Sequence, residues 1–400
     1  MDSNSLSTKQ MYMLILAIFA VSLNMRPAVT SIGPLLDTIR TDLELSNAQV
    51  SLLTALPIVC MGVFASLAPV LNRRLGLNAT MVAMILMIGV MTAVREFLPT
   101  YKVLLASSIG VGIAIAIAGP LLSAMIKQNF PTRAGAVIGI YSFGLGTGAT
   151  LSTGLSAYFY EKTASYPFAL SIWAVLAFIG LAAWLVSAND MLLVRQSVRQ
   201  PVEQTSAADA GRSPWRTGKA WLFLLFFGLQ SAAFFSIVIW LAPIAVSKGM
   251  SIVQAGTLVS LMTAVQIVLN IAIPLMMEKY PGRRMWLLFI LSIGLVAVGL
   301  FYTGNIPLLW VGALLMGLPL GGMFPIALVL PLDETKNAAE TNTWTAMMQT
   351  GGFIIGGTLP LLIGVLYDRT GRHQVTITLF ALLFIGMIVL ALLIGDKESE

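Results

Sequence analysis

The sequence contains few charged residues, one cysteine and one histidine. Only 10% of its 400 residues are charged and 58% are hydrophobic, whereas a soluble domain has about 25% charged residues. A soluble chain of this composition would expose a large apolar surface, so the composition predicts an integral membrane protein. Cys60 has no partner for a disulfide within the chain. His373 is the single histidine, which argues against a histidine-based metal site.

The net charge is +6, but the basic residues lie between apolar runs, as in membrane proteins, and do not form one cluster. We therefore expect a lipid bilayer and a small molecule as partners, and no nucleic acid. The chain has no Gly-x-x-x-x-Gly-Lys-Ser/Thr loop, so we expect neither ATP-driven transport nor a bound cofactor. The first apolar run is too long for the core of a signal peptide, and we expect it to be retained.

Twelve mainly apolar runs are each long enough to cross a bilayer, which takes about 20 residues. They cover residues 11–36, 47–71, 79–98, 102–126, 133–159, 166–187, 219–246, 252–277, 284–303, 306–331, 340–366 and 373–394. The pattern predicts an all-α membrane protein with twelve transmembrane helices. A polar linker at 188–218 then separates an N-terminal half, 1–187, from a C-terminal half, 219–400.

The distribution of Lys and Arg predicts the orientation in the membrane. If the N-terminus is cytoplasmic, the inside segments hold roughly twice as many Lys and Arg residues as the outside segments. This bias is the positive-inside rule. It predicts a multi-pass protein of the cytoplasmic (inner) membrane with both termini and the linker in the cytoplasm. We expect a monomer.

The two predicted halves contain similar segments at an offset of 205 residues. "SNAQVSLLTALPIV", from Ser46, resembles "SIVQAGTLVSLMTAVQIV", from Ser251. The same offset aligns Gln49 with Gln254, Pro69 with Pro274, and Pro120 with Pro325. Two similar six-helix halves, related by an axis along the membrane normal, are the layout of major facilitator transporters.

The chain resembles the major facilitator superfamily over essentially its whole length. The loop between that family's second and third helices usually reads Gly-x-x-x-Asp-Arg-x-Gly-Arg. Here the matching stretch is "PVLNRRLGLN", in which Arg74 and Gly76 match and Arg73 replaces the acid. The second copy, "PLMMEKYPGRR", keeps Glu278 and Lys279. The resemblance implies that these five residues take part in gating.

Three longer stretches resemble the cyanate and 2-nitroimidazole transporter family within that superfamily. They are residues 23–57, which include an arginine in the first predicted helix, residues 227–243 and residues 347–371. The resemblance implies transport of a small polar or anionic solute.

Arg26 lies near the middle of the first apolar run. An arginine near the bilayer centre costs about 2.5–3.5 kcal/mol on insertion scales. No Asp or Glu lies at a comparable depth in the predicted spans to pair with it. Two interpretations remain open. Arg26 could bind an anionic or strongly polar substrate through its planar donors, or it could bond backbone carbonyls near Pro27 or extend to the interface.

Other candidates for the substrate site are polar or aromatic residues in the predicted spans: Asn24, Tyr141, Gln230, Phe234, Gln266, Trp344, Met348 and Gln349. Gln230 is one residue from Ser231, which the offset aligns with Arg26. Its amide could contact a polar ligand, or it could join neighbouring helices. Trp344 could form a wall of the pocket, or it could belong to the packed core.

Four of the prolines inside predicted spans, Pro57, Pro120, Pro319 and Pro325, are expected to kink their helices and could act as gates. The leading hypothesis is a secondary transporter that moves a small polar anion or nitro-type solute by alternating access. The alternative is a proton-driven multidrug exporter, which would need an acid in the cavity. A membrane enzyme is less favoured because no carboxylate pair or His/Asp cluster is present for acid–base chemistry, and a sensor because no output domain is visible.

Overall fold

The computed structural model describes residues 8–130, 133–195, 213–280, 282–335 and 338–395. Every regular element in these ranges is a helix. The helices before the linker are α1 (Thr8–Asn24), α2 (Pro27–Thr30), η1 (Gly33–Leu35), α3 (Leu36–Asp42), α4 (Asn47–Val63), α5 (Leu67–Leu75), α6 (Leu77–Phe97), α7 (Tyr101–Asn129), α8 (Ala134–Thr163), α9 (Tyr166–Ser171) and α10 (Ala174–Arg195). Those after it are η3 (Pro214–Arg216), α11 (Gly218–Ser247), α12 (Ile252–Lys279), α13 (Arg283–Thr303), α14 (Ile306–Glu334), α15 (Ala338–Thr370) and α16 (His373–Ile394).

Within the described residues, ten helices or broken helices are long and apolar enough to cross a membrane, and eleven if α4 and α5 count as one span. The 30 residues of α8 are also long enough to cross a hydrocarbon core of about 30 Å, although Gly, Ser and Thr are frequent in this helix. With α8, the helices match the twelve predicted runs. Part of the predicted linker, 196–212, lies outside the described residues.

Several predicted details differ from the structure. The first run is broken, because α1 ends at Asn24 and α2 begins at Pro27. The sixth run continues to Arg195, beyond the predicted end at 187. The bend in the second run, 69°, lies between α4 and α5, and not at Pro57, which lies inside α4.

The internal repeat is visible in the first turns of α4 and α12. In α4, the Ser46 hydroxyl accepts a hydrogen bond from the Gln49 amide, and the Gln49 side chain accepts one from the Ser46 amide. Ser251 and Gln254 form the same reciprocal pair in α12. Such a capping box satisfies two of the backbone donors that a helix start leaves free. The aligned serine and glutamine residues therefore cap the N-terminus of both helices in the same way.

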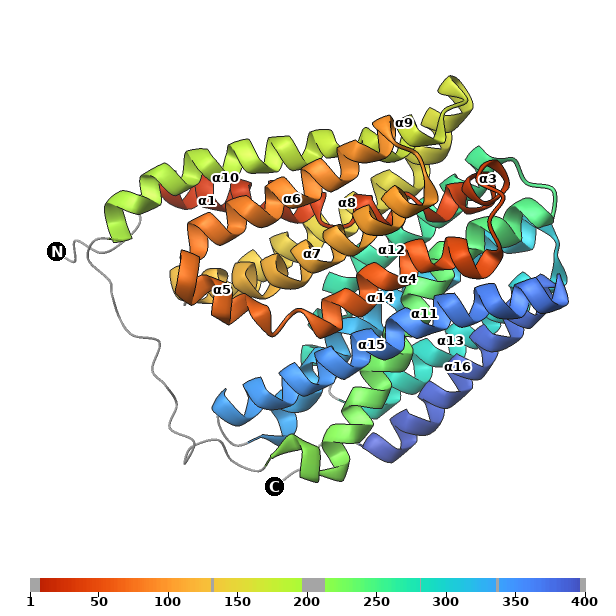
Figure 1. Ribbon diagram of the computed structural model, residues 1–400. Helices are drawn as coiled ribbons and strands as arrows, with labels where there is room; N and C mark the ends of the chain where they lie inside the picture. The colour runs from red at the N-terminus through yellow and green to blue at the C-terminus, as the bar shows by residue number, and fades with distance from the viewer. Residues whose placement is uncertain (1–7, 131–132, 196–212, 281, 336–337, 396–400) are drawn as a thin grey trace.

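Figure 1 shows the helices before the linker and the helices after it as two neighbouring groups in one elongated bundle. We call the end that holds the start of α1 and the end of α16 the terminal end. The opposite end, which holds α3 and the connection between α15 and α16, is the distal end (Figure 1). The charge distribution predicts that the distal end faces outward.

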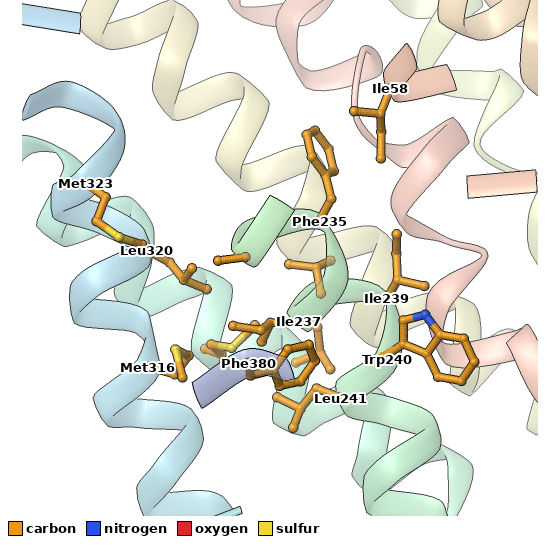
Figure 2. Packing of buried hydrophobic residues seen from close by; sticks show 14 of the residues in the cluster. Ile58, Phe235, Ile237, Ile239, Trp240, Leu241, Met316, Leu320, Met323 and Phe380 are labelled. Atoms are coloured by element: carbon orange, nitrogen blue, oxygen red, sulfur yellow. The ribbon is translucent and has the colours of Figure 1, made fainter. Parts of the chain in front are cut away.

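The buried apolar side chains form two clusters. One lies among α1, α6, α7, α8 and α10, and the other extends through α11 to α16 and includes residues of η1, α3 and α4. Figure 2 shows part of the second cluster, in which Ile237 and Leu241 of α11 lie near Met316 of α14 and Phe380 of α16. The α11 helix therefore lies at the centre of the second cluster.

The two groups of helices approach each other most closely where glycines remove the side chain. A Cβ atom built on Gly256 of α12 would lie 2.8 Å from the Thr153 carbonyl oxygen of α8. One built on Gly357 of α15 would lie 2.9 Å from the Ala55 carbonyl oxygen of α4. Small residues allow such close helix contacts in membranes. These contacts hold the distal parts of the bundle together.

Candidate functional site

A cavity of about 580 Å³ lies between the two groups of helices, from the middle of the bundle toward its terminal end. Its lining residues come from the terminal parts of α8, α12 and α14, the middle of α11 and of α15, and the break after α1. They include Arg26, Ser142, Phe143, Gln230, Ser231, Phe234, Phe235, Thr263, Gln266, Asn270, Phe324, Pro325 and Phe353. Most of the wall is apolar, with a few polar groups, which is the usual composition of a small-molecule site.

Arg26 lies at the break of the first membrane span. Pro27 has no amide hydrogen, so the α1 ladder cannot continue through it. The chain turns there, and the Arg26 carbonyl accepts hydrogen bonds from the amides of Val29 and Thr30, both at 3.0 Å. The Thr30 hydroxyl also donates to this carbonyl at 2.9 Å. The backbone of Arg26 is thus fixed, while its side chain extends into the cavity.

The Arg26 guanidinium lies over two aromatic rings of α11. Its central carbon is 5.5 Å from the Phe234 ring centre and 5.3 Å from the Phe235 ring centre. A cation–π contact contributes roughly 0.5–2 kcal/mol, depending on desolvation. Within the described chain, Arg26 forms no ion pair, and it is the one charged residue in the cavity wall. The rings cover part of the guanidinium but supply no negative charge.

The neutral polar groups of the cavity lie on three helices, and one of them, Ser142, is on α8. The Gln230 side chain donates to the Ser231 hydroxyl at 2.9 Å, which leaves its carbonyl oxygen available to a ligand. Gln266 and Asn270 line the cavity from α12. These amides provide donors and acceptors without a second charge.

Four of the predicted candidates therefore lie together: Arg26, Gln230, Phe234 and Gln266. The described cavity wall does not include the other five: Asn24, Tyr141, Trp344, Met348 and Gln349. Trp344 and Met348 are buried in the core, and the Trp344 ring packs 6.0 Å from that of Phe223. Their part in the site stays a prediction.

Asn24 and Tyr141 lie closer to the site. Asn24 is buried next to the break, and its amide nitrogen has no hydrogen-bond partner among the described residues. Tyr141 of α8 is within range of an electrostatic interaction with Arg26. Their part in the site also stays a prediction.

The predicted gating residues are spread over the terminal end and the helix interiors. Arg73 and Arg74 are exposed in the last turn of α5, and Gly76 follows with a φ of 81°, which favours glycine. Glu278 and Lys279 lie in the last turn of α12. The prolines Pro57, Pro120 and Pro325 lie inside continuous helices. Pro325 also lines the cavity.

Sequence reasoning did not identify one buried cation. Arg95, in the last turn of α6, is 1% exposed. Its Nε donates to the Ser107 hydroxyl at 2.9 Å and its Nη1 to the Ala28 carbonyl at 2.8 Å. Ala28 lies two residues after Arg26, in the broken part of the first span. The break exposes a carbonyl there, and Arg95 satisfies it.

Replacing Arg95 with alanine should destabilise the protein by about 2–4 kcal/mol, because the buried Ala28 carbonyl loses a charged donor. Arg95→Lys should cost less, since it keeps one cationic donor. Thermal unfolding of the purified variants measures both. The control is Arg73→Ala, an exposed site that should change stability by less than about 0.5 kcal/mol. Equal melting temperatures for Arg95→Ala and Arg73→Ala would contradict the observed contacts.

The described residues contain no group of three or more His, Cys, Asp or Glu that could hold a metal ion. The described cavity wall offers one guanidinium, several amides and hydroxyls, and aromatic faces as possible ligand contacts. Such a set can hold and orient a small anion. It contains no acid or base that would support hydrolysis or group transfer.

Comparisons with known proteins agree with this geometry. The pattern of the Major Facilitator Superfamily matches residues 12–357. The cyanate transport protein of Escherichia coli (strain K12) is 30% identical over 382 residues, which cover 95% of this chain and 96% of that protein. The 2-nitroimidazole transporter of the same organism is 29% identical over 398 residues, 99% of each chain.

A crystal structure of a D-xylose–proton symporter has the same fold. It superimposes with a TM-score of 0.76 and covers 98% of each chain, although the sequences are only 13% identical. The predicted fold class is therefore confirmed.

Proposed function

The chain belongs to the major facilitator superfamily and is a multi-pass membrane transporter, not an enzyme, and from this premise we propose that it carries a small anion bound to Arg26. The observation that carries this proposal is the unpaired guanidinium in a cavity whose described wall contains no carboxylate. A partly desolvated cation without a counter-ion favours a ligand that supplies the negative charge.

The shape of the site suggests a small, flat or linear substrate. The guanidinium donates in one plane, which suits carboxylate-like, nitro or linear anionic groups. Phe234 and Phe235 flank it, and we infer that a thin anion fits beside these rings better than a bulky one. Two relatives are named for cyanate and 2-nitroimidazole, and both compounds are small and flat or linear.

Transport would proceed by alternating access of this cavity to the two sides of the membrane. In the present structure the distal parts of α8 and α12 are in contact, and the cavity extends toward the terminal end. With both termini in the cytoplasm, as the Lys and Arg distribution predicts, this is an inward-facing arrangement. The proposal includes an inner-membrane location and a monomeric transporter.

Cyanate should raise the melting temperature of the purified protein more than a cation of similar size, such as tetramethylammonium. A ligand that binds only the folded state stabilises it by mass action, by about 2.7 kcal/mol at a hundred times its Kd. Thiocyanate serves as a less reactive linear anion. Thermal shifts at matched ionic strength separate binding from general salt effects.

Stabilisation by lipophilic cations alone would contradict the anion proposal and would favour a proton-driven exporter. Equal melting-temperature shifts for linear and for bulky anions would retain Arg26 as the anion site. They would contradict the proposed selection for thin substrates.

A further inference from the structure

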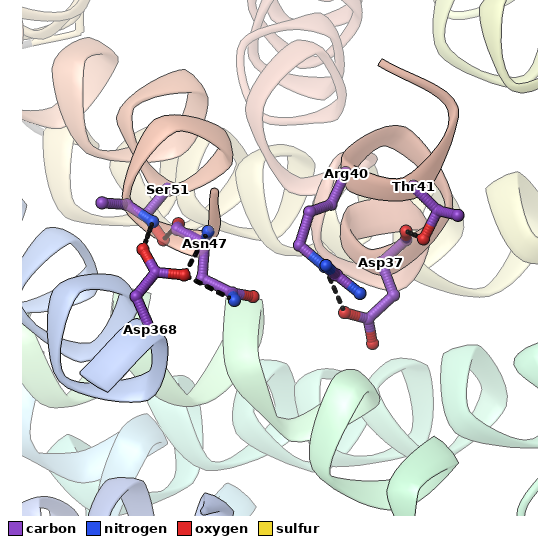
Figure 3. A network of polar contacts seen from close by, with 7 residues as sticks. Asp37, Arg40, Thr41, Asn47, Ser51 and Asp368 are labelled. Atoms are coloured by element: carbon purple, nitrogen blue, oxygen red, sulfur yellow. Dashed lines mark hydrogen bonds and ion pairs between the residues drawn. The ribbon is translucent and has the colours of Figure 1, made fainter. Parts of the chain in front are cut away.

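The distal end of the bundle contains a carboxylate contact that joins the two groups of helices. Asp368 lies near the end of α15, opposite the start of α4. One carboxylate oxygen accepts hydrogen bonds from the Asn47 amide and from the Asn47 side chain, each at 2.8 Å. The other oxygen accepts from the Ala48 amide, also at 2.8 Å. Figure 3 shows all three bonds on one carboxylate.

These bonds complete the start of α4. The capping box of Ser46 and Gln49 satisfies the amides of those two residues, and Asp368 satisfies the two amides between them. A negative charge at a helix N-terminus is also favoured by the helix dipole. The acid, however, belongs to a helix on the other side of the linker in sequence. The contact therefore exists only while α4 and α15 lie side by side.

The internal repeat shows that a helix of this kind forms without such an acid. The α12 helix starts with the same capping box, at Ser251 and Gln254. Among the described residues, no side chain accepts a hydrogen bond from its equivalent amides, those of Ile252 and Val253. Asp368 is thus not needed to start the helix. This difference between the two copies points to a role in joining α4 to α15.

The packing next to Asp368 brings the two helices close together. A Cβ atom on Gly364, one turn before Asp368, would lie 2.6 Å from the Asn47 carbonyl oxygen and would also collide with the Ser51 hydroxyl. Separation of the distal ends must therefore break the Asp368 bonds as soon as it begins. A second acid nearby, Asp37, pairs with Arg40 of its own helix at 3.6 Å (Figure 3). Among the described residues, no hydrogen bond or ion pair joins the Asp37 carboxylate to another helix.

We propose that Asp368 is a latch that stabilises the distal-closed state of the transporter. This inference rests on the proposed alternating access, in which the distal ends part to open the cavity on that side. Three hydrogen bonds to a carboxylate are lost on opening and re-formed on closing. The carboxylate is partly exposed, so water replaces some of this interaction, and the latch shifts the equilibrium without preventing transport.

Distance measurements between the distal ends test the latch without any substrate. Cysteines at Glu161 of α8 and at Arg372, before α16, carry spin labels in a Cys60→Ser background; both sites are exposed. Pulsed electron paramagnetic resonance then measures the distribution of distances between the two labels. This distribution gives the ratio of distal-open to distal-closed molecules. Asp368→Ala should raise this ratio by about tenfold, as expected when hydrogen bonds to a charged group are lost. Asp37→Ala is the matched control and should leave the ratio unchanged.

An Asp368→Ala distribution identical to that of Asp37→Ala would overturn the latch. So would a lower melting temperature without a change in distance, because that result is expected of a simple helix cap. Should Asp368→Ala not fold, Asp368→Asn gives the same test with a smaller shift, since its amide keeps one acceptor oxygen. The measurement is independent of Arg26. A failed anion screen together with a shifted ratio would contradict the proposed substrate and support the latch.

Discussion

Arg26→Ala is expected to reduce the affinity for cyanate or thiocyanate by about 30-fold or more, because a desolvated charge pair contributes about 2–5 kcal/mol. The variant should still fold. The guanidinium has no ionic partner among the described residues, so its removal leaves none of their charges unpaired. The cost to stability is limited to the two cation–π contacts with Phe234 and Phe235. Binding and stability should therefore respond very differently to this substitution.

Two further variants show which property of Arg26 matters. Arg26→Lys keeps the charge but loses the planar fork of donors, so it should bind the anion more weakly than the wild type and more tightly than Arg26→Ala. Gln230→Ala removes a neutral group from the same cavity. It should weaken binding by only about 1–1.5 kcal/mol, the value of one neutral hydrogen bond. Equilibrium binding and uptake into vesicles measure the series.

Normal uptake by Arg26→Ala, with unchanged melting and expression, would show that the arginine is structural. Loss of folding in this variant would contradict the expectation that its charge is dispensable for stability. In that case Arg26→Lys decides the binding role, through the size of its anion-dependent thermal shift relative to the wild type.

The features that could be predicted from the sequence are those set by local composition. The twelve apolar runs are visible because a helix must satisfy its own backbone in lipid, and their ends agree with the helix ends within a few residues at most positions. The exposed Arg73 and Arg74 and the half-buried Arg26 differ in their neighbours along the chain. The aligned capping boxes at Ser46 and Ser251 are local as well.

The features that could not be predicted depend on pairs of residues far apart in sequence. Arg95 follows an apolar run and is expected at the interface, but the Ala28 carbonyl, 67 residues earlier, binds its side chain inside the bundle. Asp368 lies just after the predicted run 340–366, and its partners lie more than 300 residues away in the sequence. Trp344 and Gln230 are both residue types that suit a pocket. The rotation of each helix about its own axis determines that Trp344 faces the core and Gln230 faces the cavity. Residue type alone contains none of this information.

Gly148 of α8 illustrates how such long-range packing supports the candidate site. A Cβ atom on Gly148 would collide with the carbonyl oxygen of Leu23 and lie 3.1 Å from Cδ of Pro27. In an intact helix that carbonyl would accept from the residue at position 27, but a proline cannot donate. The absence of a side chain at Gly148 therefore lets α8 approach the broken backbone that holds Arg26.

Gly148→Val is expected to destabilise the protein by more than about 3 kcal/mol and to reduce sharply the yield of monodisperse protein, because backbone atoms cannot move aside as a flexible side chain can. Gly139→Val is the matched control. It lies in the same helix, carries the same change in helix propensity, and a Cβ there meets nothing within 4 Å. Size-exclusion profiles and melting temperatures of the two variants measure the difference.

Gly148→Ala, with the smallest possible side chain, should lie between wild type and Gly148→Val in stability. It should also weaken anion binding, because α8 can accept the Cβ only by moving away from the turn that orients Arg26. Equal stability of Gly148→Val and Gly139→Val would show that α8 does not approach α1 this closely, and the support for the Arg26 turn would have to come from Thr30 and Arg95 alone.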